Sequence, residues 1–277
     1  MRHAKIVCTL GPKSSSREMV DKLIAAGMDV ARLNFSHGTH DTHRATYQIL
    51  RERSATWNRP IAILQDLQGP KIRMGILSPD KIPVLEDGSI VVLTLDANDH
   101  RPNAYLADYD RLLQDVQPGD PILLDDGKIV LDVINANHRE LTVRVMQGGA
   151  LRSKIGMHLP QSRISTKALS DRDIVDLRLG LELGVDYVAL SFVRHADDIL
   201  RLRHLIGKET PHIIAKIERP EAVGHLEEIL DAADGIMVAR GDLGVELQPE
   251  KVPIIQKNGD RHGKRARQTR DCCHTNA

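Results

Sequence analysis

The sequence is poor in aromatic residues, poor in cysteine and without an excess of either charge. Its 277 residues include 2 Phe, 4 Tyr, 1 Trp and 3 Cys, and 38 Lys and Arg balance 38 Asp and Glu. Cys8 stands far from the adjacent pair Cys272 and Cys273, a spacing typical of neither a disulfide framework nor a zinc motif. The balanced charge argues against a protein that binds nucleic acid or an anionic membrane through bulk charge.

Long hydrophobic runs are absent as well. The apolar stretch 6–10 is too short for a signal peptide. No run approaches the roughly 20 residues that span a bilayer. We therefore expect a cytoplasmic protein with neither a nucleic-acid nor a membrane partner. Hydrophobic residues still make up 41% of the chain, which predicts a globular fold with an aliphatic core.

Strand-like and helix-like segments alternate along most of the chain. The predicted strands are 5–11, 30–36, 60–67, 187–193, 212–217 and 235–240, and the predicted helices are 16–27, 39–57, 171–183, 196–207 and 220–233. This alternation is typical of βαβ units and predicts an α/β fold with a parallel sheet.

Two parts of the chain break this alternation. Between residues 71 and 163 there is no convincing long helix, and strands are predicted at 89–95, 121–124, 128–134 and 140–146, which indicates an inserted all-β module. The segment 256–277 contains no large hydrophobic residue and carries six Lys or Arg against two Asp. We expect it to be disordered, either as a natural basic tail or as out-of-frame translation.

Two predicted strands in the first part of the chain end in polar residues. Arg32, Asn34 and Ser36 alternate with apolar residues, so their side chains share one face of a strand. Such a face suits a phosphate and a cation, although a half-exposed antiparallel strand has the same pattern. Asp66 ends the next strand, and the Gly-Pro turn after it is expected to direct Arg73 toward the same edge of the sheet. A solvated charged loop is the alternative for this segment.

Two later strands end in charged residues. Lys216 and Glu218 share one face, and Gly241 and Asp242 follow the next strand. Two carboxylates on adjacent strands suit Mg²⁺, and a lysine beside them could neutralise a phosphoryl group. A structural Lys–Glu ion pair is the alternative. No Walker loop is present, so the residues favour phosphoryl transfer outside the P-loop class.

Five ordered motifs within about residues 3–256 resemble the pyruvate kinase family. They are KIVCTLGP at 5–12, RLNFSHG at 32–38, DLQGPKIR at 66–73, AKIE at 215–218 and ARGDLG at 239–244. The resemblance implies an incomplete (β/α)₈ TIM barrel, with six of eight strands, over 1–70 and 164–255, a small β-barrel lid domain over 71–163, and a disordered non-family tail over 256–277. It implies phosphoryl transfer from phosphoenolpyruvate to ADP, giving pyruvate and ATP, with Mg²⁺ and usually K⁺.

The resemblance also implies roles for individual residues. Catalysis would involve Lys216, Arg32 and Arg73. The substrate would bind Arg32, Lys216, Gly241 and Asp242, and the nucleotide would bind Asn34, His37, Arg73 and Lys154. The Mg²⁺ ligands would be Glu218 and Asp242, and the K⁺ ligands Asn34, Ser36, Asp66 and the carbonyl of Leu67.

The sequence departs from the family pattern in three places. Leu67 stands where many members have Thr, and Lys71 stands where potassium-dependent members have Glu, so its ammonium is an alternative to K⁺. After residue 257 the family continues with two further strands and a C-terminal domain. We therefore expect little turnover, and the homotetramer that the family implies relies heavily on this C-terminal domain for its assembly. A Mg²⁺-dependent barrel lyase or aldolase acting on pyruvate-like enolates, an inactive truncated product, and a tail that binds RNA or a partner remain as alternatives.

Overall fold

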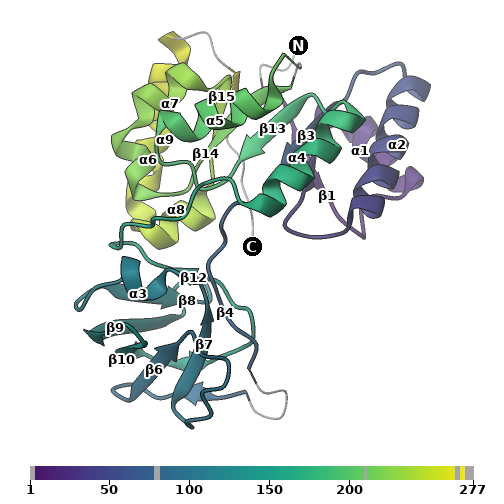
Figure 1. Cartoon of the computed structure of the whole chain (residues 1–277). Helices are drawn as coiled ribbons and strands as arrows, with labels where there is room; N and C mark the ends of the chain where they lie inside the picture. The colour runs from purple at the N-terminus through teal and green to yellow at the C-terminus, as the bar shows by residue number, and fades with distance from the viewer. Residues whose placement is uncertain (1–3, 78–81, 209–210, 266–268, 272–277) are drawn as a thin grey trace. The chain divides into compact units, whose positions relative to one another are not determined.

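The computed structural model describes residues 4–77, 82–208, 211–265 and 269–271. The chain divides into two compact units, each with its own sheet (Figure 1). The first unit comprises Met1–Pro70, Lys167–Leu243 and Lys251–Ala277, and the second comprises Lys71–Thr166 and Gly244–Glu250. The second unit begins at the residue where the sequence predicts that the strand and helix alternation stops.

The first unit contains a parallel sheet of seven strands in the order β1-β2-β3-β13-β14-β15-β16. The strands are β1 (Val7–Leu10), β2 (Val30–Asn34), β3 (Ala62–Asp66), β13 (Tyr187–Leu190), β14 (His212–Ile217), β15 (Gly235–Val238) and β16 (Thr269–Asp271). Every pairing in the sheet is parallel. The arrangement is that of an incomplete (β/α)₈ barrel, which confirms the predicted fold class.

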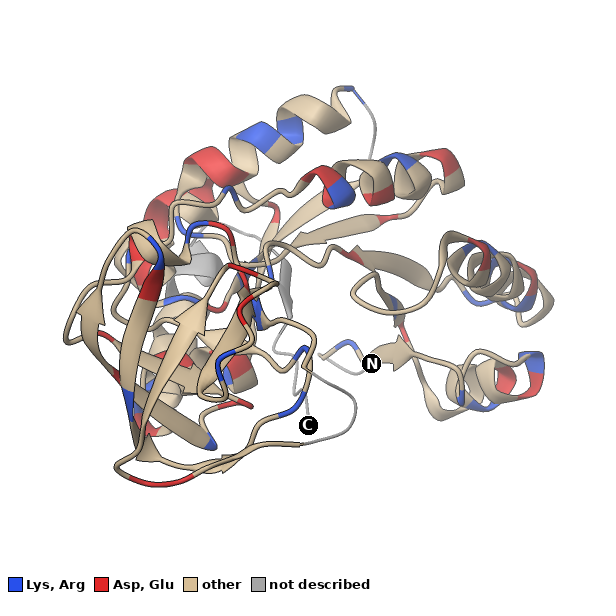
Figure 2. Cartoon of the chain, turned by 60° about the horizontal axis from the view of Figure 1, so that its bottom comes forward, with Lys and Arg blue, Asp and Glu red and all other residues tan. Residues whose placement is uncertain are grey.

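Helices connect these strands. They are α1 (Arg17–Ala26), α2 (His40–Thr56), α4 (Asp171–Leu183), α5 (Ala196–Ile206), α6 (Pro220–Gly224), α7 (Leu226–Ala232), α8 (Arg240–Glu246) and α9 (Val252–Arg265), with a 3₁₀ turn at Pro249–Lys251. Ser16 and Ser170 cap α1 and α4 through their side chains, and Gly27 ends α1 in the left-handed conformation at φ 106°. Acidic and basic residues are mixed along the helices, as Figure 2 shows.

Two predicted elements have different ends in the structure. The helix predicted over 220–233 is divided at His225, whose φ of −111° and ψ of 20° are not helical. β2 ends at Asn34, because the Asn34 side chain accepts a hydrogen bond from the backbone of Ser36 at 3.0 Å and the chain turns there. The prediction that Ser36 shares a strand face with Arg32 is therefore wrong.

The segment predicted to be disordered over 256–277 is partly ordered. α9 continues to Arg265, and β16 pairs with β15. Val252 and Ile255 at the start of α9 are buried. They precede residue 256, so the prediction of disorder, made from the polar segment 256–277, did not include them. The sheet consequently has seven described strands instead of the expected six. Residues 266–268 and 272–277, with Cys272 and Cys273, lie outside the described residues.

The second unit is a small β-barrel. Its elements are β4 (Arg73–Met74), β5 (Val84–Leu85), β6 (Ile90–Thr94), β7 (Ala104–Asp108), α3 (Leu112–Asp115), β8 (Pro121–Leu124), β9 (Ile129–Ala136), β10 (Glu140–Gln147), β11 (Gly149–Ala150) and β12 (Met157–His158). The main sheet has the order β12-β8-β9-β10-β6-β7-β4, and a bridge between Arg73 and Gly156 brings its two edges together. Alternate residues such as Ile129, Leu131 and Val133 fill the interior.

The strands predicted for this unit match β6, β8, β9 and β10. The strand β7, the two-residue strands β4, β5, β11 and β12, and the helix α3 were not predicted. Among the described residues, no helix combines the length and the hydropathy that crossing a membrane requires.

Candidate active site

One face of the parallel sheet changes from apolar to charged toward the carboxyl ends of its strands. An apolar cluster on this face takes one residue from each of five strands, namely Val30, Leu64, Ala189, Ile214 and Met237. Side chains alternate between the two faces of a strand, so the same face continues two residues later. There it carries Arg32, Asp66, Ser191 and Lys216, all buried. Reactive groups gather at this edge in parallel α/β folds.

Asp66 at the end of β3 holds two cations from neighbouring strands. Its Oδ2 accepts a hydrogen bond from Nε of Arg32 at 2.7 Å, and its Oδ1 lies 3.2 Å from Nζ of Lys216. Asp66 is 1% exposed. Arg32 also donates to Oγ1 of Thr9 on β1 at 3.0 Å. A carboxylate buried this deeply is stable only with such partners, so Asp66 positions both cations.

Lys216 is bound on three sides. Its ammonium lies 2.8 Å from Oε1 of Glu218 and donates to Oγ of Ser191 at 2.8 Å, in addition to its contact with Asp66. Burial lowers the pKa of Lys216, but the charges of Asp66 and Glu218 outweigh burial, and the net shift of its pKa is upward. The side chain therefore stays cationic at neutral pH.

Glu218 combines deep burial with a second carboxylate nearby. It is 2% exposed, and its Oε2 accepts a hydrogen bond from the backbone of Phe192 at 2.9 Å. Burial raises the pKa of Glu218, the charge of Asp242 raises it further, and Lys216 opposes both effects without cancelling them. A divalent cation between the two acids would relieve the desolvation and the repulsion, so this donor set fits Mg²⁺.

The residues expected to bind a monovalent cation lie along the ends of β2 and β3. Asn34 and Asp66 are register partners in the sheet. The carbonyl of Leu67 accepts a hydrogen bond from Oγ of Ser191 at 2.7 Å, and Asn34 accepts one from the backbone of Ser36. Asp66 is already paired with two cations. In the structure the Leu67 carbonyl and Oδ1 of Asn34 thus accept hydrogen bonds within the protein, and Asp66 is ion-paired.

Five further predicted residues have no described contact with this network. Within the second unit, Nη1 of Arg73 donates to the carbonyl of Lys154 at 3.2 Å, and Lys71 is exposed. In the first unit, the carbonyl of His37 contacts Nε2 of His43 at 2.9 Å, and Gly241 is exposed in the first turn of α8. The structure brings Arg32, Asp66, Lys216 and Glu218 into one buried network.

Three residues of this network were not predicted. Ser191 links Leu67 to Lys216, Thr9 binds Arg32, and the backbone of Phe192 binds Glu218 at a positive φ of 56°. Ser191 could have been found, because it directly follows the apolar residues of β13 and is a fifth polar strand end. Phe192 acts through its backbone N–H, so its residue type could not have predicted this role.

A family model and the similar curated proteins both indicate one family. A family model described as pyruvate kinase, barrel domain, matches residues 1–270, which extends beyond the predicted end of the similarity at residue 256. A pyruvate kinase of Staphylococcus aureus strain MRSA252 is 43% identical over 262 residues, covering 93% of this chain and 45% of that relative. The pyruvate kinase of strain USA300 is 42% identical with the same coverage. The chain thus spans just under half the length of these relatives.

Replacing the central cation tests how far the network depends on it. Lys216→Met leaves Glu218 without its ion pair and Asp66 with Arg32 alone, so we expect the free energy of unfolding to fall by about 3 kcal/mol. Urea titration followed by circular dichroism measures this change. Lys22→Met is the control, because Lys22 pairs with Glu18 on the exposed surface of α1 and should change little. Equal effects of the two variants would contradict the prediction.

Proposed function

The chain belongs to the pyruvate kinase family, and we propose that it transfers a phosphoryl group from phosphoenolpyruvate to ADP, giving pyruvate and ATP. The observation that carries this proposal is the buried ammonium of Lys216, held between Asp66 and Glu218 at the carboxyl edge of the sheet. Phosphoryl transfer needs preorganised positive charge more than covalent chemistry, and a fixed buried cation supplies it.

We propose that Lys216 acts by charge and not as a base. Its pKa is raised by Asp66 and Glu218, so it does not release its proton near neutral pH. In the reaction the bond between phosphorus and the enol oxygen breaks, a bond to the terminal phosphate of ADP forms, and the enolate takes up a proton. A lysine that remains cationic throughout stabilises the negative charge on the transferring group.

Glu218 and Asp242 are the proposed ligands of Mg²⁺. The fit rests on the buried carboxylate of Glu218, on its repulsion from the partly buried carboxylate of Asp242, and on the oxygen ligands that Mg²⁺ prefers. When bound, Mg²⁺ would neutralise phosphate charge. Gly241 and Asp242 at the first turn of α8 are proposed to contact the substrate, because this turn follows β15 at the same edge of the sheet.

Arg32 is the proposed second cation for the phosphate. Asp66 and Thr9 hold its guanidinium in one orientation, which lowers the entropy cost of binding a ligand. We further propose that 71–163 forms the lid domain, and that Arg73 and Lys154 in it, with Asn34 and His37 in the first unit, contact the nucleotide. The hydrogen bond from Arg73 to the backbone of Lys154 supports a shared role for these two residues.

The reaction itself is the direct test. With Mg²⁺ present, the chain should form pyruvate from phosphoenolpyruvate only when ADP is added, measured as the initial rate of pyruvate formation. Lys216→Met should lower this rate about 10²–10³-fold, because it removes a preorganised charge. Lys22→Met should leave it unchanged. Pyruvate formation without ADP would instead favour a lyase, and a folded protein that forms none with ADP would contradict the proposal.

The affinity for Mg²⁺ should depend on pH. The ion binds ionised Glu218, and because burial and Asp242 raise the pKa of this carboxyl, its protonated form persists to higher pH than that of an exposed glutamate. The affinity should therefore fall as the pH decreases through this raised pKa, with proton release on binding. Calorimetric titration with Mg²⁺ over a pH series measures both. Glu218→Gln should weaken binding by more than the roughly 10–100-fold that losing an outer-shell partner costs, and it should abolish this pH dependence; an unchanged pH profile would exclude Glu218 as a ligand.

Lys71 should make the reaction nearly independent of K⁺. We propose that its ammonium takes the place of the monovalent cation, since it stands where potassium-dependent members of the family carry Glu and it is exposed in the structure. Initial rates in KCl and in choline chloride should then be similar, and Lys71→Glu should create activation by K⁺. Strong activation of the unaltered protein by K⁺ over the choline control would contradict this.

A further inference from the structure

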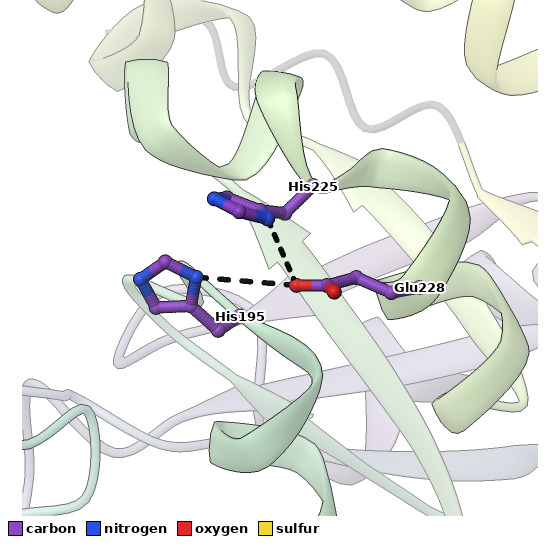
Figure 3. Close-up of side chains that lie close together, drawn as sticks. All are labelled: His195, His225 and Glu228. Carbon is purple, nitrogen blue, oxygen red and sulfur yellow. Dashed lines mark ion pairs between the residues drawn. The ribbon is translucent and has the colours of Figure 1, made fainter.

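Two histidines and one glutamate, none of them assigned to catalysis, come together at the surface of the first unit. His195 directly precedes α5, His225 stands between α6 and α7, and Glu228 lies in the first turn of α7. α5 and α7 pack against each other, so the three residues meet although His195 is distant from the others in sequence. Figure 3 shows a ring nitrogen of each histidine directed at the glutamate.

We propose that His195, His225 and Glu228 form a binding site for a transition-metal ion of the Zn²⁺ type. Each of the three residues offers one ligand atom, and these atoms all lie within 4.8 Å of one another. Two imidazoles and a carboxylate are a donor set that zinc uses with water in a fourth position. The proposal is independent of the reaction proposed above.

The distances need little adjustment to accept an ion. Nδ1 of His225 lies 3.0 Å from Oε1 of Glu228, and Nδ1 of His195 lies 3.9 Å from the same oxygen. In a tetrahedral site with Zn–N bonds of about 2.0–2.1 Å, neighbouring ligand atoms are about 3.3 Å apart. The observed separations bracket this value.

The three side chains have room for the small movement that binding an ion would require. The side chains of His195, His225 and Glu228 are 48%, 44% and 48% exposed, so they can rotate and an ion can reach them from solvent. The two imidazole rings already meet edge to face, with centroids 4.3 Å apart. The backbone, in contrast, is held by two packed helices, which keeps the ligands together.

The chemistry of the cluster distinguishes its ion from Mg²⁺. Imidazole nitrogen suits Zn²⁺, Co²⁺ and Ni²⁺, whereas Mg²⁺ prefers oxygen ligands and retains its water. The buried Glu218 and the partly buried Asp242 offer only oxygen. The first unit would therefore carry two metal sites that select different ions. The site formed by His195, His225 and Glu228 would link α5 to α7.

Titration with Zn²⁺ at pH 7.5 in excess Mg²⁺ tests the proposal. At this pH free imidazole is mostly neutral and available as a ligand. The full chain carrying Cys8→Ser, Cys272→Ser and Cys273→Ser is the background, because thiols would otherwise compete for zinc. We expect one Zn²⁺ per chain, with His195→Asn and His225→Asn each weakening the affinity about 100-fold or more, beyond the effect of losing an outer-shell partner. Glu228→Gln should weaken it as well.

His204→Asn is the matched control, because His204 is an exposed histidine on α5 outside the cluster. It should bind Zn²⁺ like the background protein. Zinc should also raise the melting temperature of the background protein and of His204→Asn, but not of His225→Asn. Absence of binding in excess Mg²⁺, or binding that the three cluster substitutions leave unchanged, would overturn the proposal.

Discussion

The buried carboxylate of Asp66 is the constraint on which the candidate site depends. It binds Arg32 of β2 on one oxygen and Lys216 of β14 on the other, so one acid links strands on both sides of β3. Lys216 then reaches Glu218, and positive and negative groups alternate through the network. Isolated charges at this depth would cost several kcal/mol each, and only the register of the parallel strands keeps all of them paired.

The turn after β3 is held by a second buried acid. Asp173 in the first turn of α4 accepts hydrogen bonds from the backbone of Gly69 at 3.0 Å and of Ser170 at 2.9 Å. Gly69 has a φ of 69°, and a Cβ there would lie 2.8 Å from the ring of Phe192. This turn consequently requires glycine. The capping box of α4 thus orders both the helix and the loop that follows Asp66.

The sequence was most informative where local chemistry and tertiary structure agree. The helix over 171–183 has the predicted bounds because Ser170 caps it and Gly184 ends it, and both signals are local. The helix predicted over 220–233 failed at His225, since its apolar periodicity continues across a break that only the backbone dihedral angles show. The end of α9 was missed because Val252 and Ile255, which anchor it, precede the polar segment.

The residues alone determined the parallel α/β sheet, the inserted β-barrel and the family, because strand alternation, turn residues and ordered motifs are properties of contiguous segments. They also predicted that Lys216 and Glu218 lie close together at one strand end, and the two side chains are ion-paired at 2.8 Å although β14 ends at Ile217. Only the tertiary structure joined Asp66 to Lys216 and His195 to His225 and Glu228. Contacts between distant segments depend on strand register and helix packing, which no single stretch of sequence contains.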